Sequence, residues 1–254
     1  MGEGILSMTN FQIAIEKPEE IIPRLGKQEL HWKQGRSAYE LSTSWIQAKG
    51  LPPSVRAVLD QADEWRDAKL LEGFFERETE LPGRGRPSQT DLLALVRLKG
   101  GNAILGVEGK VDEPFGELVE DWLKGKPYEK AGEPPEAAAA RQRSTRNRRE
   151  RFNALCGILE IDPADLGGFY YQLFHRTCAS IYEAKRFECK RATVLVHSFA
   201  AIPEAPLESA CFEDFSAFTT KIGMPVIRPG AISTSKTFAG IELRLGWVSD
   251  KPSS

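Results

Sequence analysis

Cysteine and histidine are scarce in this 254-residue sequence, and the few that occur lie far apart. The four cysteines form no C-x-x-C pair, and none lies in a cluster with one of the three histidines. This scatter argues against a zinc site and a disulfide framework, and it fits a reducing compartment. No run of about 18 apolar residues is present, so no segment is expected to span a membrane. Residues 1–20 lack the basic-then-apolar order of a signal peptide, and we therefore expect a soluble, cytoplasmic protein.

The signatures of several enzyme classes are missing as well. The sequence contains no G-x-x-x-x-G-K-S/T, no G-x-G-x-x-G after a strand, no H-E-x-x-H and no G-x-S-x-G. These absences argue against a P-loop nucleotide hydrolase, a dinucleotide-binding enzyme, a zinc protease and a serine hydrolase.

An excess of charge of one sign is also lacking, because 34 basic residues stand against 36 acidic ones and the net charge is −2. This balance excludes a uniformly basic coat for nucleic acid but allows a local basic patch. Basic residues gather at Arg84 and Arg86 and in residues 141–151, which contain six arginines. The second group either neutralises phosphates or forms the solvated half of a helix.

The chain is long enough to bury a sizeable core, and 41% hydrophobic residues is ordinary for a globular protein. Apolar periodicity predicts helices over 37–49, 54–68, 115–123, 135–160, 169–190 and 208–222, and strands over 74–81, 92–98, 103–111, 192–199 and 240–248. This order predicts an α/β or α+β fold in a single domain, 1–254. The polar stretch 124–135 is the one internal boundary that the composition suggests.

Three charged residues stand out on two consecutive predicted strands: Asp91, Glu108 and Lys110. A hairpin loop centred on Gly100-Gly101 would place Asp91 opposite Lys110, and all three residues on one face of the sheet. A slip of one residue would send Asp91 to the other face.

These residue types in this arrangement are typical of metal-assisted chemistry at phosphate. Two carboxylates a few ångströms apart are costly unless a cation lies between them or one is protonated. Mg²⁺ takes one or two protein carboxylates and leaves positions for water and phosphate oxygens. A neighbouring lysine could orient or help to deprotonate the attacking water, while Arg84 and Arg86 could contact a phosphate backbone.

Asp91, sixteen intervening residues and then Glu108-x-Lys110 across a hairpin resemble the PD-(D/E)xK nuclease superfamily, which has the restriction-endonuclease-like fold. The superfamily core is α-β-β-β-α-β, which the predicted elements match over 37–199. The resemblance implies a hydrolase, endonuclease or exonuclease, in which Asp91 and Glu108 bind Mg²⁺ or Mn²⁺ and Lys110 assists the water. The sequence departs from the family in its first motif, where Asp91 follows Ser-Gln-Thr rather than proline.

The same resemblance implies further features. Gln172, on the helix after the third strand, would support the catalytic site, and Glu40 would be an acidic metal ligand on the first helix. The fold would be a mixed β-sheet with a three-stranded meander and a crossover helix, flanked by helices. It would comprise an N-terminal helical part (1–68), a nuclease-like core (69–200) with a helical insertion (114–166), and a C-terminal helix and strand (201–254). Nucleic acid, with DNA favoured, is the implied partner, no membrane is involved, and a homodimer is compatible.

Longer stretches are similar to an uncharacterised bacterial protein family of about this length: HWKQGRSAYEL, EGKVDEPFG, YQLFHRT and LVHSF. That resemblance implies no activity. Two alternatives to a nuclease therefore stay open. One is a catalytically inactive protein of the same fold that binds nucleic acid or a protein partner, and the other is a structural protein whose hairpin charges are ordinary surface.

Each site residue also has a structural interpretation. Glu108 and Lys110 could form an ion pair on a solvated strand, and Asp91 could cap a turn. Gly106 and Gly109, which flank Glu108, favour function because glycine inside a strand can mark a close backbone approach.

For the helical residues the structural interpretation is at least as strong. Ser37-x-x-Glu40 is a capping box, which explains Glu40 without catalysis. Gln172 could be satisfied at a helix edge, and His175 and Arg176 are expected to face solvent or to be paired.

Overall fold

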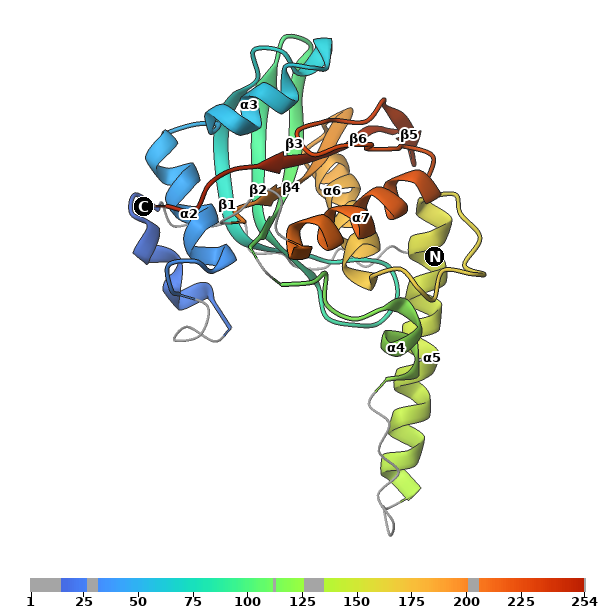
Figure 1. Cartoon of the computed structure of the whole chain (residues 1–254). Coiled ribbons are helices and arrows are strands. Elements are labelled where there is room, and N and C mark those ends of the chain that lie inside the picture. Colours follow the sequence, from blue (N-terminus) through green and yellow to red (C-terminus); the bar gives the residue numbers. More distant parts are fainter. Residues whose placement is uncertain (1–14, 27–31, 112, 126–134, 201–205, 254) are drawn as a thin grey trace.

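The computed structural model describes residues 15–26, 32–111, 113–125, 135–200 and 206–253. It is a mixed α/β structure in which helices flank a six-stranded mixed sheet of order β1-β2-β3-β4-β6-β5 (Figure 1). The strands are β1 (Lys69–Thr79), β2 (Ser88–Leu98), β3 (Gly101–Lys110), β4 (Arg191–Ser198), β5 (Lys236–Phe238) and β6 (Ile241–Ser249). The helices are α2 (Ser37–Ala48), α3 (Pro53–Leu59), α4 (Val119–Lys124), α5 (Pro135–Ile158), α6 (Tyr171–Arg186) and α7 (Pro206–Lys221), with 3-10 helices at Pro18–Arg24 and Asp63–Trp65.

The sheet combines an antiparallel half with a parallel half. Strands β1, β2 and β3 form the predicted meander, with antiparallel pairing throughout. Strand β4 then pairs parallel to β3, and β6 pairs parallel to β4, while the short β5 runs antiparallel to β6. Helix α6 belongs to the crossover that joins β3 to the parallel β4, as expected for parallel neighbours. The prediction of a mixed sheet flanked by helices is therefore confirmed.

Apolar side chains cover both faces of the sheet, and β3 shows how one strand serves both. Leu105 packs into the core under α2 and α3, while its neighbour Ile104 packs into the core under α5, α6 and α7. This is the alternation that a strand imposes on consecutive side chains. Glu108, four residues after Ile104, therefore points to the α6 side.

The two glycines that flank Glu108 are close-approach positions, as the sequence suggested. A Cβ at Gly106 would collide with the Ser180 hydroxyl of α6. A Cβ at Gly109 would lie 3.3 Å from the Ser37 carbonyl oxygen, where α2 begins on the other face. Glycine at these two points lets a helix approach each face of the strand that carries Glu108.

The β2–β3 hairpin has a different register from the one expected. Leu98 pairs with Gly101, so the loop is the two-residue turn Lys99-Gly100 rather than a loop centred on Gly100-Gly101. Arg97 and Asn102 are direct partners, and the Arg97 Nε donates to Asn102 Oδ1 at 2.7 Å, which favours the tight turn. The register moves by two residues, which preserves the face of every side chain. Asp91 consequently comes opposite Glu108 instead of Lys110.

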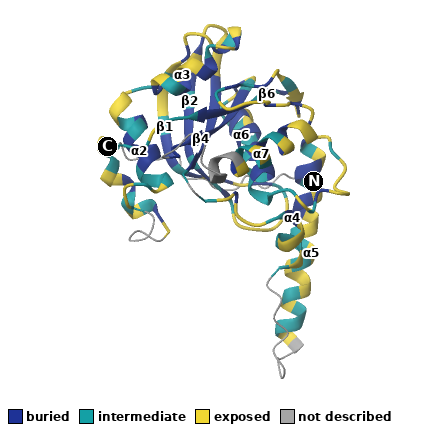
Figure 2. Cartoon of the chain, in the orientation of Figure 1, coloured by how far each residue is buried: buried dark blue, intermediate teal, exposed yellow. Residues whose placement is uncertain are grey.

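Several element boundaries differ from those expected. The predicted helix over 54–68 is divided into α3 and the 3-10 helix Asp63–Trp65, because the chain turns to bury Trp65 completely. Strand β2 begins at Ser88, and the three-residue β5 was not predicted because so short a strand has no readable alternation. Helix α5 extends beyond the body of the molecule, and exposed and intermediate residues cover its far end (Figure 2). Within the described residues, no helix has the length and apolar character needed to cross a membrane.

Candidate functional site

Asp91, Glu108 and Lys110 converge where β2 begins and β3 ends. The Gly109 backbone N–H donates to Asp91 Oδ2 at 2.9 Å, which fixes the Asp91 carboxylate against β3. The Lys110 Nζ lies 3.1 Å from Glu108 Oε1 and donates a hydrogen bond to it. Glu108 and Lys110 are only 4% and 5% exposed, so they do not form an ion pair on a solvated strand.

Helix α6 supplies two more members of the cluster. Gln172 Nε2 donates to Glu108 Oε1 at 2.6 Å, and Gln172 Oε1 accepts from Lys110 Nζ at 3.1 Å. One turn later, Arg176 Nε donates to Glu108 Oε2 at 2.6 Å, and Arg176 Nη2 lies 3.7 Å from Asp91 Oδ1. Gln172 and Arg176 share a helix face because they are four residues apart. Arg176 is thus paired, one of its two expected states, and it joins both carboxylates.

A short chain of hydrogen bonds leads away from Arg176. Its Nη1 donates to the Ser88 hydroxyl at 3.1 Å, and that hydroxyl lies 2.7 Å from His175 Nδ1. Burial lowers the pKa of His175 well below its usual range, and the positive charges of Arg176 and Arg151 add to that effect. His175 is therefore a neutral hydrogen-bonding group at physiological pH.

Glu76 on β1 is a third carboxylate of the site, and sequence reasoning missed it. Its neighbours Phe75 and Arg77 pair with Leu92 and Thr90 of β2, which places Glu76 beside Asp91. Its φ of 54° is a left-handed conformation that is unusual for a residue with a side chain. Only the register of β1 against β2 could have identified Glu76, and the local sequence does not show that register.

Burial and mutual repulsion perturb the acidic groups of this cluster. Burial raises the pKa of Asp91 to about 7, and the Glu108 charge adds to the rise while Arg176 and Lys110 oppose it. Burial also raises the pKa of Glu76 to about 8, with the Asp91 charge as the second cause. For Glu108, burial acts upward but Arg176 and Lys110 outweigh it, and its pKa is lowered. For Lys110, burial acts downward but Glu108 and Asp91 outweigh it, and its pKa is raised.

The cluster opens into a cavity of about 570 Å³ beside the start of α2. The charged residues that line it are four carboxylates and three cations: Glu76, Asp91, Glu108, Glu113, Arg36, Lys110 and Arg176. A ligand of moderate size can therefore reach the carboxylates from solvent.

Glu40 is not among the residues that line this cavity. It is 1% exposed, and its two carboxylate oxygens accept from the Gly35 N–H at 2.7 Å and from the Ser253 N–H at 2.6 Å. The expected capping box does not form, because Arg36 rather than Ser37 is the N-cap of α2, no side chain caps the helix, and Glu40 accepts from Gly35 instead. These contacts give Glu40 a structural role, and the structure does not bring it to Asp91 and Glu108.

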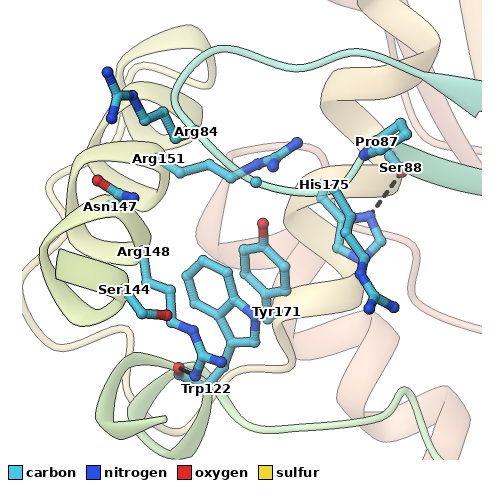
Figure 3. Close-up of a pocket in the computed structure, with 12 residues that line it drawn as sticks. Arg84, Pro87, Ser88, Trp122, Ser144, Asn147, Arg148, Arg151, Tyr171 and His175 are labelled. Atoms are coloured by element: carbon cyan, nitrogen blue, oxygen red, sulfur yellow. Dashed lines mark hydrogen bonds between the residues drawn. The ribbon is translucent and has the colours of Figure 1, made fainter. Parts of the chain in front are cut away.

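Arg84 and Arg86 lie on the β1–β2 loop and line a second cavity, which Figure 3 shows. Part of the 141–151 segment lines it as well, because Arg151 of α5 packs against the loop and Arg148 points toward Trp122 of α4 (Figure 3). The segment is therefore not simply the solvated half of a helix.

The carboxylates of the cluster are candidate ligands for a cation. In the part of the chain that the structure describes, no three His, Cys, Asp or Glu side chains are grouped as a metal site. Glu76, Asp91 and Glu108 nevertheless lie beside two cations, Lys110 and Arg176, and the pKa values of Asp91 and Glu76 are raised first by burial and second by carboxylate repulsion. A divalent cation near Asp91 and Glu108 would relieve that repulsion.

These features define a mixed α/β protein with a buried carboxylate, lysine and arginine cluster at the junction of its antiparallel meander and its crossover helix. The chain belongs to a family described as a domain of unknown function, DUF6946, whose model matches residues 14–252. No curated protein and no solved structure shows significant similarity to it.

Proposed function

We propose that this protein is a metal-dependent nuclease of the PD-(D/E)xK superfamily that hydrolyses phosphodiester bonds of nucleic acid, with DNA the favoured substrate. One observation carries the proposal. Asp91 and Glu108 lie on adjacent strands, on one face, joined by Arg176, and the Lys110 amine is 3.1 Å from Glu108 in a cavity open to solvent.

The order of elements supports the same assignment. Helix α2, the meander β1–β3, helix α6 and strand β4 occur in the order α-β-β-β-α-β, that of the restriction-endonuclease-like core, with α3 and a 3-10 helix inserted before β1 and with α4 and α5 inserted before α6. The acidic residues lie on the second and third of these strands, where the superfamily motif requires them.

Asp91 and Glu108 would hold Mg²⁺ or Mn²⁺, and Glu76 replaces Glu40 as the additional acidic residue. When bound, such an ion supplies Lewis-acid stabilisation of phosphate charge and a more acidic water. Deprotonated Asp91 is required for this, and its pKa of about 7 means that cation binding releases a proton near neutral pH.

The remaining residues have roles that follow from their contacts. The raised pKa of Lys110 keeps its amine protonated, so it orients water and stabilises developing negative charge rather than accepting a proton. Gln172 bonds both Lys110 and Glu108, and Arg176 bonds Glu108 at its other oxygen. Both act as positioning residues.

The test is a cleavage assay on single- and double-stranded DNA and RNA with Mg²⁺ or Mn²⁺. We expect cation-dependent cleavage that is abolished in Glu108→Gln and Lys110→Met, with circular dichroism unchanged. Glu78→Gln, at an exposed residue of β1, is the matched control and should cleave normally. Cleavage that survives both site substitutions would overturn the proposal.

A second candidate is a catalytically inactive protein of this fold that binds nucleic acid or a protein. It is favoured by the saturation of Glu108, whose two oxygens already accept from Lys110, Gln172 and Arg176. Tight nucleic-acid binding without cleavage in either metal would select this candidate.

A further inference from the structure

The second cavity, of about 610 Å³, lies between the β1–β2 loop and helices α4, α5 and α6 (Figure 3). Of the twelve described residues that line it, four are arginines and none is acidic: the arginines are Arg84, Arg86, Arg148 and Arg151. So many cations around one cavity, without a lining carboxylate, favour an anionic ligand.

Arg151 gives the strongest indication of such a ligand. It is 3% exposed, its side chain extends into the cavity, and its Nε has no hydrogen-bond partner among the described residues. A buried cation without a partner is costly, and an anion would remove that cost.

The β1–β2 loop is shaped around this arginine. A Cβ at Gly85 would collide with the Arg151 guanidinium, and a Cβ at Gly83 would lie 2.9 Å from the Arg151 Cα. Gly83 also has a φ of 83°, which glycine adopts without strain. The Gly-Arg-Gly-Arg sequence thus lets the loop close over Arg151 while it presents Arg84 and Arg86.

The opposite wall holds Arg148 in place. Its Nη1 donates to the Trp122 carbonyl at 2.6 Å, and its guanidinium lies 5.6 Å from the Trp122 ring centroid. Trp122 is also stacked on Tyr171, with ring centroids 3.6 Å apart. Because the indole is already engaged by both partners, a phosphate fits this wall better than a stacked base does.

The cavity is connected to the carboxylate cluster. Ser88 and His175 line it, and Ser88 accepts from Arg176, which lines the carboxylate cavity. Ser88 and Asp91 are three residues apart on β2, a separation of about 10 Å along the strand. The two cavities can therefore engage one polyanionic strand together.

We propose that this cavity is a phosphate-binding site, in which Arg84, Arg86, Arg148 and Arg151 hold a phosphate of a nucleic-acid strand beside the carboxylate cluster. The choice of nucleic acid rests on the proposed nuclease function, whereas the phosphate chemistry rests on the arginines alone. The phosphate belongs either to the strand interior or to its end, and the experiment distinguishes the two.

Inorganic phosphate is the first probe, with thermal unfolding measured at constant ionic strength against chloride. We expect millimolar phosphate to raise the Tm of the wild-type chain and of Glu108→Gln. Arg151→Gln and Arg86→Gln should lose most of this shift, and the exposed Arg86 keeps the test valid if Arg151→Gln folds poorly. Arg149→Gln, an exposed arginine of α5 that does not line the cavity, is the charge-matched control and should keep the shift. Equal phosphate and chloride effects in the wild-type chain, or equal losses in Arg86→Gln and Arg149→Gln, would overturn the proposal.

The second probe is a single-stranded DNA oligonucleotide with a 5′-phosphate, a 3′-phosphate or neither, bound by Glu108→Gln. We expect Arg148→Gln to lower the affinity of this background at least about tenfold more than Arg149→Gln does. Tighter binding of a phosphorylated end assigns the cavity to a terminal phosphate, and equal binding of all three assigns it to the backbone. Unchanged affinity in Arg148→Gln would overturn the proposal. Phosphate binding without any cleavage would instead overturn the nuclease function and leave the phosphate site standing.

Discussion

Helix α6 carries two buried carboxylate–arginine contacts two turns apart, and they differ in the number of acids rather than in burial. At one, Arg176 contacts Glu108 and Asp91, with Glu76 close by. At the other, Glu183 contacts Arg77 of β1 and Arg186 of α6 itself. Glu108 is 4% exposed and Glu183 is completely buried, so burial alone does not separate the two contacts.

The Glu183 contact is buried and has more cations than carboxylates, because Arg186 Nη1 also lies 3.8 Å from Glu183 Oε2. Arg77 donates from Nε to Oε1 at 3.3 Å and from Nη2 to Oε2 at 3.2 Å, and Thr79 donates to Oε1 at 2.8 Å. The Glu183 carboxylate thus accepts a bidentate pair of hydrogen bonds from Arg77, which joins β1 to α6. The Glu108 cluster has more carboxylates than cations and an opening to solvent. An excess of carboxylates beside an opening to solvent is the property that makes the Glu108 cluster, rather than the Glu183 contact, a candidate ligand site.

The largest expected effect is on stability, at the Glu183 contact. Glu183→Gln keeps the shape of the side chain but leaves Arg77 buried without a carboxylate, which should cost about 3–5 kcal/mol of unfolding free energy. Urea denaturation measures this cost. Glu78→Gln, exposed on the same strand as Arg77, should change stability by less than about 0.5 kcal/mol. A cost for Glu183→Gln below about 1 kcal/mol would show that the two contacts are not different in kind.

The next expected effect follows from the proposed nuclease function and concerns cleavage at the Glu108 cluster. Glu108→Gln should lower the cleavage rate at least about 10²–10³-fold, the range typical of removing one preorganised charge contact. Its cost in stability should be well below that of Glu183→Gln, because Asp91 and Glu76 remain to balance Arg176 and Lys110. Equal destabilisation by the two substitutions in urea would contradict the surplus of carboxylates.

The raised pKa of Asp91 should also make the stability of the protein depend on pH. The pKa of Asp91 is raised from 3.8 to about 7, so between these values the folded state holds a proton that the unfolded state has released. Stability from this group is complete below pH 3.8 and is lost as pH rises through about 7. Metal-free protein should therefore become less stable across this range, and Asp91→Asn or saturating Mn²⁺ should flatten the profile. Thermal unfolding from pH 4 to pH 8 gives the measurement, and a profile that rises with pH in metal-free protein would be the contrary result.

The smallest effects concern hydrogen-bonding neighbours. Gln172→Leu should slow cleavage about 10–100-fold, because Glu108 and Lys110 lose the amide that orients them. Thr79→Val at the Glu183 contact should cost about 1 kcal/mol of stability and leave cleavage unchanged. Steady-state kinetics and urea denaturation of both variants test the contrast, and it fails if Thr79→Val slows cleavage as much as Gln172→Leu does.

Much of the sheet was predictable because its signals are local. The alternation over 103–111 identified β3 and the face of Glu108, and glycines at 106 and 109 marked where helices approach. The hairpin register was wrong by two residues, yet the convergence of Asp91 and Glu108 survived because an even shift preserves the face.

The rest of the site depends on contacts between segments distant in sequence. Glu76 reaches Asp91 through the pairing of β1 with β2, and Arg176 reaches Glu108 through the docking of α6. The local sequence does not distinguish Glu76 from the exposed Glu78. It also does not distinguish the buried Arg151 from the exposed Arg149, two residues before it. Glu40 was predicted as a metal ligand because it is an acidic residue on the first helix. Its carboxylate instead accepts from the backbone of Gly35 and Ser253, contacts that the local sequence does not show.

The left-handed backbone at Glu76 has a consequence for selection. A glycine there would adopt the same φ of 54° without strain and would remove a carboxylate from a crowded cluster, gaining about 1 kcal/mol or more. A screen for heat resistance should therefore repeatedly recover Glu76→Gly. A screen for the proposed activity should discard the same substitution, so Glu76 is a position where stability and activity are expected to trade off.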